Sequence, residues 1–312
     1  MGVDGQIVKA LSGFYYVKTD VSRRVYMCRA RGKFKNEGIS PLVGDFVRIE
    51  IQDEEEGVVD EILPRRNSFI RPPVANIDAF LLIMAVHNPA PNSEVLDKLL
   101  VNAEAARAGA IICMNKADGE EEELEARKFA KVYEGIYPIL YVSAISGKGV
   151  AAVREAILGK TVALAGPSGV GKTSLVSALT DDWALETGEL SRKTGRGKHT
   201  TRSVEIYEIG DGSAKGIPQQ TKLMDTPGFT SFEVDIDEDE RLDMLFPDFV
   251  PYLGNCRFDN CTHENEPECA VLEALSKRKI SQGRYNTYLK LLAAERGESD
   301  RPEYVKGHKK NG

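Results

Sequence analysis

The sequence is short of cysteine, tryptophan and long apolar runs. Among its 312 residues are 5 cysteines and a single tryptophan. A disulfide framework needs more cysteines and an even number of them, so we expect none. No apolar run approaches the roughly 20 residues of a membrane-spanning helix, so we expect no membrane association.

The N-terminus lacks a targeting signal, and the chain lacks an excess of positive charge. Residues 1–6 contain no basic segment followed by an apolar one, and Gln6 does not fit the myristoylation pattern. We therefore expect a cytoplasmic protein. The formal net charge of -7 argues against a protein that coats nucleic acid indiscriminately, although a basic face can coexist with a negative average.

The composition is that of a globular protein with more than one domain. Hydrophobic residues make up 42% of the chain and charged residues 29%, which are ordinary values. At about 100 to 200 residues per domain, the length allows two or three domains. Breaks in the patterns described below divide the chain into residues 1–72, 73–235 and 236–312, and we expect a monomer.

The first domain has the pattern of a small β-barrel. Short β-rich runs without helical period alternate with turn residues; they are Gly5 to Ala10, Phe14 to Lys18, Arg24 to Arg29, Asp45 to Ile51 and Gly57 to Ile62. Five short strands at this spacing favour a closed barrel of the OB type. The prolines and charges of residues 64–73 then predict a linker.

Aromatic and basic residues are interspersed in this domain. The aromatic residues are Phe14, Tyr15, Tyr16, Tyr26 and Phe34, with arginines and lysines among them. Such a mixture is typical of surfaces that stack RNA bases and neutralise phosphates, which predicts an RNA-binding domain. Half of the aromatic residues could equally form the barrel core while the charges solvate it, and the sequence leaves both interpretations open.

The middle of the chain contains a phosphate-binding loop. The residues that fit the pattern G-x-x-x-x-G-K-[ST] are Gly166, Pro167, Ser168, Gly169, Val170, Gly171, Lys172 and Thr173. The apolar run Thr161 to Ala165 precedes them and a predicted helix, Lys172 to Leu179, follows, as nucleotide binding requires. Backbone N–H groups and the helix N-terminus would meet the phosphates, Lys172 would reach the outer phosphates and Thr173 would hold Mg²⁺.

A second stretch indicates that the nucleotide carries guanine. Asn115-Lys116-Ala117-Asp118 follows the predicted strand Ala110 to Met114 and fits the N-K-x-D element of GTPases. The Asp118 carboxylate would accept hydrogen bonds from N1–H and the 2-amino group of guanine, a pair of donors that adenine does not offer. The stretch follows the carboxyl end of a strand, where ligands bind in open α/β sheets.

Two further GTPase elements are present. Ser143 and Ala144 begin a turn similar to the S-A-K element, with Ile145 in place of lysine. The stretch Asp225-Thr-Pro-Gly228 fits D-x-x-G: Asp225 would bond a Mg²⁺-bound water and the Gly228 N–H would meet the γ-phosphate. Ordinary GTPases carry the phosphate loop first, whereas here the guanine-reading elements come first. The sequence therefore predicts a circularly permuted GTPase domain.

The rest of this domain alternates between strand and helix. The other predicted strands are Ile77 to Val86, Ile139 to Val142, Val204 to Ile209 and Thr221 to Met224. The predicted helices run from a cap at Ser93 to about Ala108, where Gly109 stops the helix, from Glu121 to Tyr133, and from Val150 to Ile157. The continuous apolar run that begins at Ile77 is expected of a parallel strand buried on both faces.

The last domain contains a candidate metal site. Cys256-x4-Cys261-x-His263-x5-Cys269 supplies three thiolates and one imidazole. Four such ligands leave no open position, which favours one structural zinc ion; redox-active thiols are the alternative. Helices are predicted from Pro267 to Lys279 and from Gln282 to Glu295, and their basic residues either contact phosphate backbones or form an ordinary solvated face.

In these motifs the chain resembles the circularly permuted GTPases of small ribosomal subunit biogenesis, the RsgA/YjeQ family. The matching residues are Asn115 to Asp118, Gly166 to Ser174, Gly195 to Thr201, Asp225 to Phe229 and the Cys/His cluster. The resemblance covers nearly the whole chain and extends the GTP and GDP contacts to Ser174. It implies an OB domain, a permuted GTPase and a helical zinc domain that together dock on the small subunit's rRNA and assist or check late maturation.

The residue that orients the attacking water is not the usual one. Ras-like enzymes place a glutamine directly after D-x-x-G, but this chain has Phe229 there. The loop Gly195 to Thr201 lies where switch I belongs, so we expect His199 to position the water, although a histidine among basic residues could instead face RNA. Thr200 or Thr201 would complete the Mg²⁺ shell, and the resemblance favours Thr201.

The leading prediction is an enzyme that hydrolyses GTP slowly by itself and faster on the small ribosomal subunit, because docking can order a mobile catalytic loop. Lys172, His199 and Thr201 are its predicted catalytic residues. One alternative is a nucleotide-regulated RNA-binding or scaffold module with incidental hydrolysis. Another is a P-loop ATPase, against which Asp118 argues.

Overall fold

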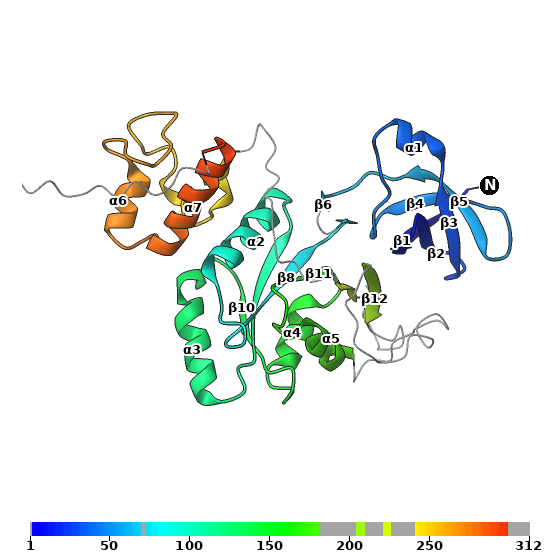
Figure 1. Cartoon of the computed structure of the whole chain (residues 1–312), viewed down its shortest axis with the longest axis horizontal. Helices are drawn as coiled ribbons and strands as arrows, with labels where there is room; N and C mark the ends of the chain where they lie inside the picture. Colours follow the sequence, from blue (N-terminus) through cyan, green and yellow to red (C-terminus); the bar gives the residue numbers. More distant parts are fainter. Residues whose placement is uncertain (1, 70–72, 181–203, 210–220, 226–240, 299–312) are drawn as a thin grey trace, which may run out of the picture.

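A computed structural model describes residues 2–69, 73–180, 204–209, 221–225 and 241–298. Figure 1 shows a blue β-barrel, a central sheet flanked by helices, and an orange and red helical region beyond it. Within the described ranges no helix is both long enough and apolar enough to cross a membrane.

The N-terminal barrel has the predicted five strands. They are β1 (Val3–Leu11), β2 (Phe14–Thr19), β3 (Val25–Ala30), β4 (Phe46–Ile51) and β5 (Glu56–Ile62). Their order is β1-β2-β3-β5-β4, and β4 pairs back onto β1, which closes the barrel. The OB-type fold class is confirmed, and closure leaves no free strand edge within this set.

The barrel domain also contains one short helix that the sequence pattern did not reveal. The helix α1 (Gly32–Asn36) lies between β3 and β4 and buries Phe34. Five residues are little more than one helical turn, so they carry too few apolar positions to show a helical period.

The barrel aromatics divide between the core and the surface. Tyr26 and Phe34 are buried, at 6% and 5% exposure. Phe14, Tyr15 and Tyr16 are half-buried, and the Arg29 guanidinium lies 4.8 Å from the centre of the Phe14 ring. Stacking on aromatic faces therefore occurs at the barrel surface, within the protein itself.

The central domain is an open, mostly parallel sheet. Its strands are β8 (Ala79–Ala85), β9 (Gly109–Asn115), β10 (Ile139–Tyr141), β11 (Thr161–Ala165), β12 (Glu205–Ile209) and β13 (Thr221–Asp225). They are ordered β10-β9-β8-β11-β13-β12, and only β12 runs antiparallel to its neighbour. Helices α2 (Ser93–Ala105) and α3 (Glu120–Ala130), with the 3-10 turn η1 (Lys131–Tyr133), cover one face. Helices α4 (Val150–Ile157) and α5 (Lys172–Thr180) cover the other.

The central position of strand β8 explains why every residue of this strand is apolar. Leu82 and Met84 pack into the cluster that includes α2 and α3, whereas Leu81 and Ile83 pack into the cluster with α4 and α5. Successive side chains of a strand point to opposite faces, so a strand covered on both faces needs apolar residues throughout. The α/β prediction for this domain is confirmed.

The predicted ends of the first helix need correction. Asn92, not Ser93, is the N-cap, since its side-chain oxygen accepts a hydrogen bond from the Val95 N–H at 3.2 Å. The helix ends at Ala105, and Gly109 already belongs to β9. Arg107, with φ 51°, takes the left-handed conformation just after the end of the helix.

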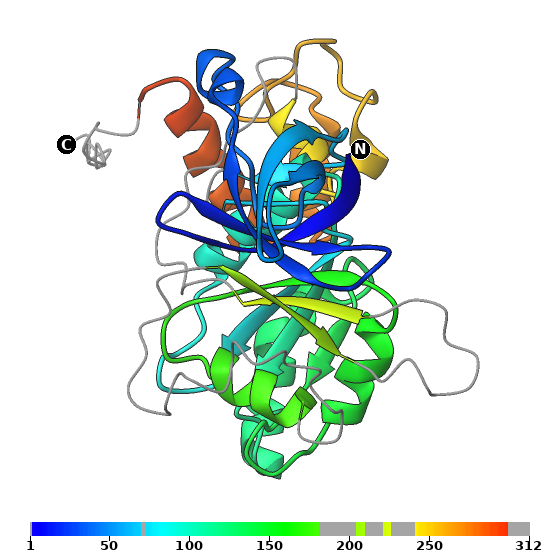
Figure 2. The same cartoon turned by 90° about the vertical axis from the view of Figure 1, so that its right-hand side faces the viewer.

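The barrel joins the sheet directly. Strand β1 pairs with β12 through Lys9 and Glu205, and Figure 2 shows the dark blue barrel strands beside the yellow β12–β13 pair. The segment predicted as a linker forms a two-stranded sheet, β6 (Ser68–Phe69) with β7 (Val74–Ala75). Gly44 sits at this junction, where its carbonyl accepts a hydrogen bond from Asn76 Nδ2 at 3.1 Å.

The C-terminal region packs on α2. It consists of the 3-10 turns η2 (Leu242–Leu245) and η3 (Val250–Tyr252) and the helices α6 (Ala270–Ser276) and α7 (Gln282–Glu295). Arg284 of α7, only 1% exposed, forms ion pairs with Asp97 of α2 at 2.8 Å and with Asp248 at 2.6 Å. Thr287 and Tyr133 also donate to Asp97, so the buried charges have their hydrogen bonds.

Substitution of Gly44 tests the junction between barrel and sheet. Its φ is +97°, and an added Cβ would collide with the Ala75 carbonyl oxygen and lie 2.7 Å from Met224 Cε. Gly44→Ala should therefore lower the free energy of unfolding by about 3 kcal/mol, as measured by denaturant titration. Gly38→Ala is the control: its φ is +68° but the space is open, so about 1 kcal/mol is expected. Equal losses in the two variants would contradict the close approach.

Candidate nucleotide site and metal centre

Three of the predicted nucleotide elements meet at one edge of the sheet. The N-K-x-D stretch ends β9, the Ser143 turn follows β10, and the phosphate loop follows β11. Because these strands are parallel, their carboxyl ends lie together. The structure thus brings together residues that are far apart in the sequence, such as Asn115 and Val170, which are fifty-five positions apart.

The phosphate loop runs between β11 and α5 as the pattern requires. Gly166 has φ +149°, and a Cβ there would collide with the Ile83 carbonyl oxygen of β8, so only glycine fits. Lys172 Nζ donates to the carbonyl oxygens of Gly166 at 2.7 Å and Pro167 at 2.8 Å. Thr173 and Ser174 are exposed in the first turn of α5, which leaves their side chains accessible to a ligand.

Asn115 joins the three elements. Its Nδ2 donates to the Val170 carbonyl of the phosphate loop at 2.8 Å, and its Oδ1 accepts from the Ala144 N–H at 3.1 Å. Sequence reasoning treated Asn115 and Ala144 as ligand contacts. In the structure their polar groups also hold the segments to each other.

Asp118 is exposed at the rim of this edge, and a second side chain orients it. Ser143 Oγ donates to Asp118 Oδ1 at 2.5 Å and accepts from the Ser146 N–H at 3.1 Å. The carboxylate therefore has one oxygen held by the protein and keeps acceptor capacity for donors outside it.

Lys116 contacts residues that sequence reasoning missed. Its Nζ donates to the carbonyl oxygens of His87, at 3.3 Å, and Asn88. Both residues follow β8, which carries no GTPase motif in the sequence. The sequence offered one signal, the position of this loop, because a loop that follows a central parallel strand lies at the edge where ligands bind.

Several predicted site residues lie outside the described part of the chain. These are His199 and Thr201 of the candidate switch I loop and Gly228 of D-x-x-G. Asp225 ends β13, which places the start of D-x-x-G next to β11 and its phosphate loop.

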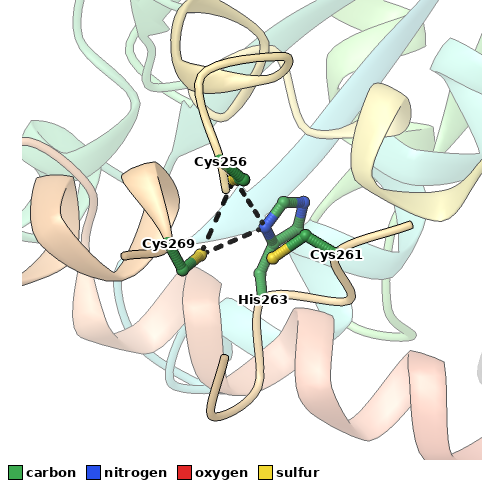
Figure 3. A group of neighbouring side chains, drawn as sticks. All are labelled: Cys256, Cys261, His263 and Cys269. Carbon is green, nitrogen blue, oxygen red and sulfur yellow. Dashed lines mark hydrogen bonds between the residues drawn. The ribbon is translucent and has the colours of Figure 1, made fainter. Parts of the chain in front are cut away.

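The four predicted metal ligands come together. The Sγ atoms of Cys256, Cys261 and Cys269 and a ring nitrogen of His263 all lie within 4.8 Å of one another (Figure 3). Cys256 Sγ is 3.7 Å from His263 Nδ1 and 3.9 Å from Cys269 Sγ, and Nδ1 is 3.3 Å from Cys269 Sγ. A tetrahedron with Zn–S bonds of about 2.3 Å separates its ligand atoms by about 3.8 Å, so this set fits zinc.

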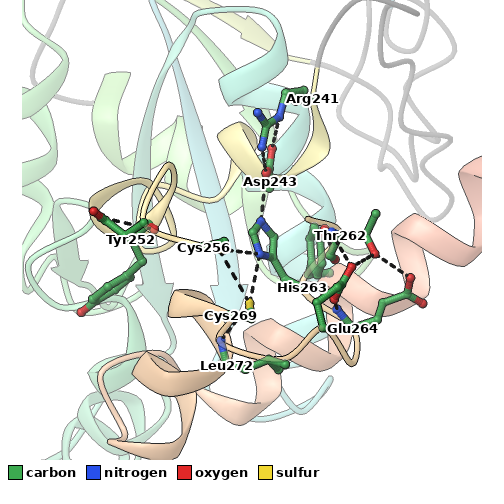
Figure 4. A network of polar contacts seen from close by, with 12 residues as sticks. Arg241, Asp243, Tyr252, Cys256, Thr262, His263, Glu264, Cys269 and Leu272 are labelled. Atoms are coloured by element: carbon green, nitrogen blue, oxygen red, sulfur yellow. Dashed lines mark hydrogen bonds and ion pairs between the residues drawn. The ribbon is translucent and has the colours of Figure 1, made fainter. Parts of the chain in front are cut away.

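Asp243 orients the histidine of this cluster. Figure 4 shows His263 Nδ1 facing the sulfurs, while Nε2 lies 3.1 Å from Asp243 Oδ2, which Arg241 also contacts. Burial alone would raise the pKa of Asp243, but the hydrogen bonds from His263 and Arg241 outweigh it and lower that pKa. Such a carboxylate behind the ring fixes which nitrogen faces the metal. Asp243 lies outside the Cys/His spacing, so the sequence carried no signal for it.

The other two cysteines are core residues. Cys28 and Cys113 are fully buried, and burial raises the pKa of their thiols to about 11 and about 12. At neutral pH both therefore stay protonated and unreactive, which separates them from the Cys/His cluster.

Fold and site together define a circularly permuted GTPase. Models of the RsgA N-terminal domain and the RsgA GTPase match residues 4–59 and 62–235. The chain belongs to the RsgA GTPase family and is a GTP hydrolase.

Relatives and solved structures agree with this assignment. The small ribosomal subunit biogenesis GTPase RsgA of Caldanaerobacter subterraneus subsp. tengcongensis is 43% identical over 291 residues, covering 93% of this chain and 95% of the relative. YjeQ from Thermotoga maritima superposes with a TM-score of 0.77 at 30% identity, covering 97% of this chain and 100% of that one. YloQ, described as a circularly permuted GTPase, gives 0.71 at 33%, covering 97% and 98%.

Removal of one thiolate tests the metal centre. Cys256→Ala should reduce zinc from about one ion per chain to well below that, measured by elemental analysis, and should lower the melting temperature, because a three-ligand site binds the ion less tightly. Cys28→Ala is the control, because it removes a buried thiol far from the cluster and should keep the zinc. Stoichiometric zinc in the Cys256→Ala protein would contradict the assignment.

Proposed function

We propose that this protein is a GTPase of small ribosomal subunit biogenesis whose hydrolysis of GTP is stimulated by the subunit. The observation that carries the proposal is the meeting of the phosphate loop, N-K-x-D and the Ser143 turn, with Asp118 held by Ser143 at 2.5 Å. Relatives that are 43% identical over almost their full length bear the name small ribosomal subunit biogenesis GTPase.

Each residue of this edge has a proposed role. The backbone of residues 166–171 and the Lys172 ammonium bind the phosphates, and Asp118 accepts from the guanine edge. Thr173 is the described residue that would hold Mg²⁺, which neutralises charge that develops on the phosphates. From the sequence we add Asp225 and Gly228 at the γ-phosphate, Thr201 at the metal, and His199 as the group that positions water.

The flanking domains supply the proposed RNA contacts. Half-buried aromatic residues and the Arg29–Phe14 stack lie on the barrel, which is suited to single-stranded bases. The Cys/His cluster, loaded with one structural zinc ion, holds the loops beside α6 and α7 in a single arrangement. A partner that contacts both flanks spans the GTPase between them, so its docking can act on the nucleotide site.

GTP turnover with purified ribosomal subunits tests this function. Small subunits should raise kcat by about 100-fold, since an ordered catalytic group contributes about that much, and large subunits should leave it unchanged. Absence of stimulation, or equal stimulation by both subunits, would contradict the proposal. The first outcome would instead support an RNA-binding module with incidental hydrolysis.

His199→Ala tests the proposed water-positioning residue. Subunit-stimulated turnover should fall about 100-fold while the Kd for GTP changes little, because the imidazole acts on the water and not on the bound nucleotide. Lys193→Ala is the control, since it removes a charge from the same segment of the sequence but not the water-positioning group. Unchanged stimulated turnover in His199→Ala would show that another group positions the water.

A further inference from the structure

The loop between β8 and α2, residues 86–92, lies in the middle of the nucleotide edge. Strand β8 sits between β9, which ends in N-K-x-D, and β11, which leads into the phosphate loop. The loop that follows β8 therefore begins between these two elements, although its sequence fits no nucleotide-binding pattern.

The loop contacts N-K-x-D and lies close to the phosphate loop. The Val86 N–H donates to the Asn115 carbonyl at 3.0 Å, and Lys116 Nζ donates to the carbonyls of His87 and Asn88. On the other side, Pro89 Cδ is 3.6 Å from where a Cβ on Gly169 would be. The loop therefore lies between N-K-x-D and the phosphate loop, joined by hydrogen bonds to the former.

Lys116 is restrained both in its backbone and at its charged end. Its backbone has φ +65°, a conformation uncommon for lysine, and its ammonium is held on the loop. A free lysine side chain samples many rotamers, and anchoring the charged head removes most of them. The methylene groups of Lys116 are then confined to one conformation, two residues before Asp118 in the sequence.

We propose that His87 and Asn88 are positioning residues of the nucleotide site. Their carbonyl oxygens hold the Lys116 ammonium and so fix the N-K-x-D segment that carries Asp118. The proposal rests on the proposed role of Asp118 in binding the guanine of GTP and GDP. The proposed role affects the rate at which the nucleotide dissociates and does not involve the hydrolysis step.

Asn88 offers a substitution that moves a carbonyl without removing it. Its φ is +47° and its side chain is exposed. Asparagine tolerates this left-handed conformation, glycine adopts it freely, and a β-branched residue is strongly disfavoured there. Asn88→Val should thus displace the carbonyl that Lys116 contacts, whereas Asn88→Gly keeps the backbone and serves as the matched control.

The experiment measures dissociation of a fluorescent GDP analogue and kcat at saturating GTP. Asn88→Val should speed dissociation about 10-fold, the effect of weakening one charge-assisted hydrogen bond, with kcat within about 2-fold of the parent. Asn88→Gly should behave as the parent does. If Asn88→Val fails to fold, as judged by its melting curve, Asn88→Ala replaces it with a smaller side chain and a smaller displacement.

A double-mutant cycle separates positioning from a general loosening of the site. Lys116→Met keeps an apolar stem but has no ammonium, so Asn88→Val should add nothing to dissociation in that background. Additive effects, or parent-like dissociation in Asn88→Val, would overturn the proposal.

Nucleotide preference distinguishes failure of this inference from failure of the proposed function. The parent should bind GDP in preference to ADP, and Asp118→Ala should lose that preference. A parent without the preference would refute the proposed site as a whole. A parent with it, combined with parent-like Asn88→Val, would refute only the role of the loop.

Discussion

The candidate site depends on one buried carboxamide. Asn115 is 2% exposed, donates to Val170 and accepts from the Ala144 N–H. A buried amide that loses its partners costs about 1–3 kcal/mol per unsatisfied group, so the three segments are held in one arrangement. The distance between the proposed phosphate and guanine contacts is thereby set by the protein before a nucleotide binds, and little binding energy is spent on ordering the site.

Local patterns in the sequence predicted most of the fold. The predicted bounds of α4, β11 and α7 agree with the structure. The hydrophobic pattern and the glycines that predict each of these elements are local to it. The phosphate loop and the Cys/His cluster were found for the same reason, because the residues of each motif lie close together in the sequence. The short helix α1 was missed because five residues show no period.

Contacts between distant segments could not be predicted in this way. His87 and Asn88 act on Lys116 through backbone carbonyls, which no side-chain pattern reveals. Asp243 contacts His263 from a separate 3-10 turn, and Lys222 of β13 donates to Gln6 of the barrel at 2.6 Å. Burial lowers the pKa of Lys222, which stands three residues before Asp225 on the same strand. The barrel is therefore in direct contact with the strand that leads to D-x-x-G.

The Arg284–Asp97 ion pair limits how this protein can be divided. Asp97 is fully buried and belongs to the GTPase sheet's own helix, yet its counter-charge comes from α7, beyond the zinc ligands. A GTPase domain cut out at the motif boundaries would keep the carboxylate but lose the guanidinium and the Thr287 hydroxyl that bind it. Any shortened form of this protein must therefore keep α2 and α7 together, because neither contact surface is complete without the other.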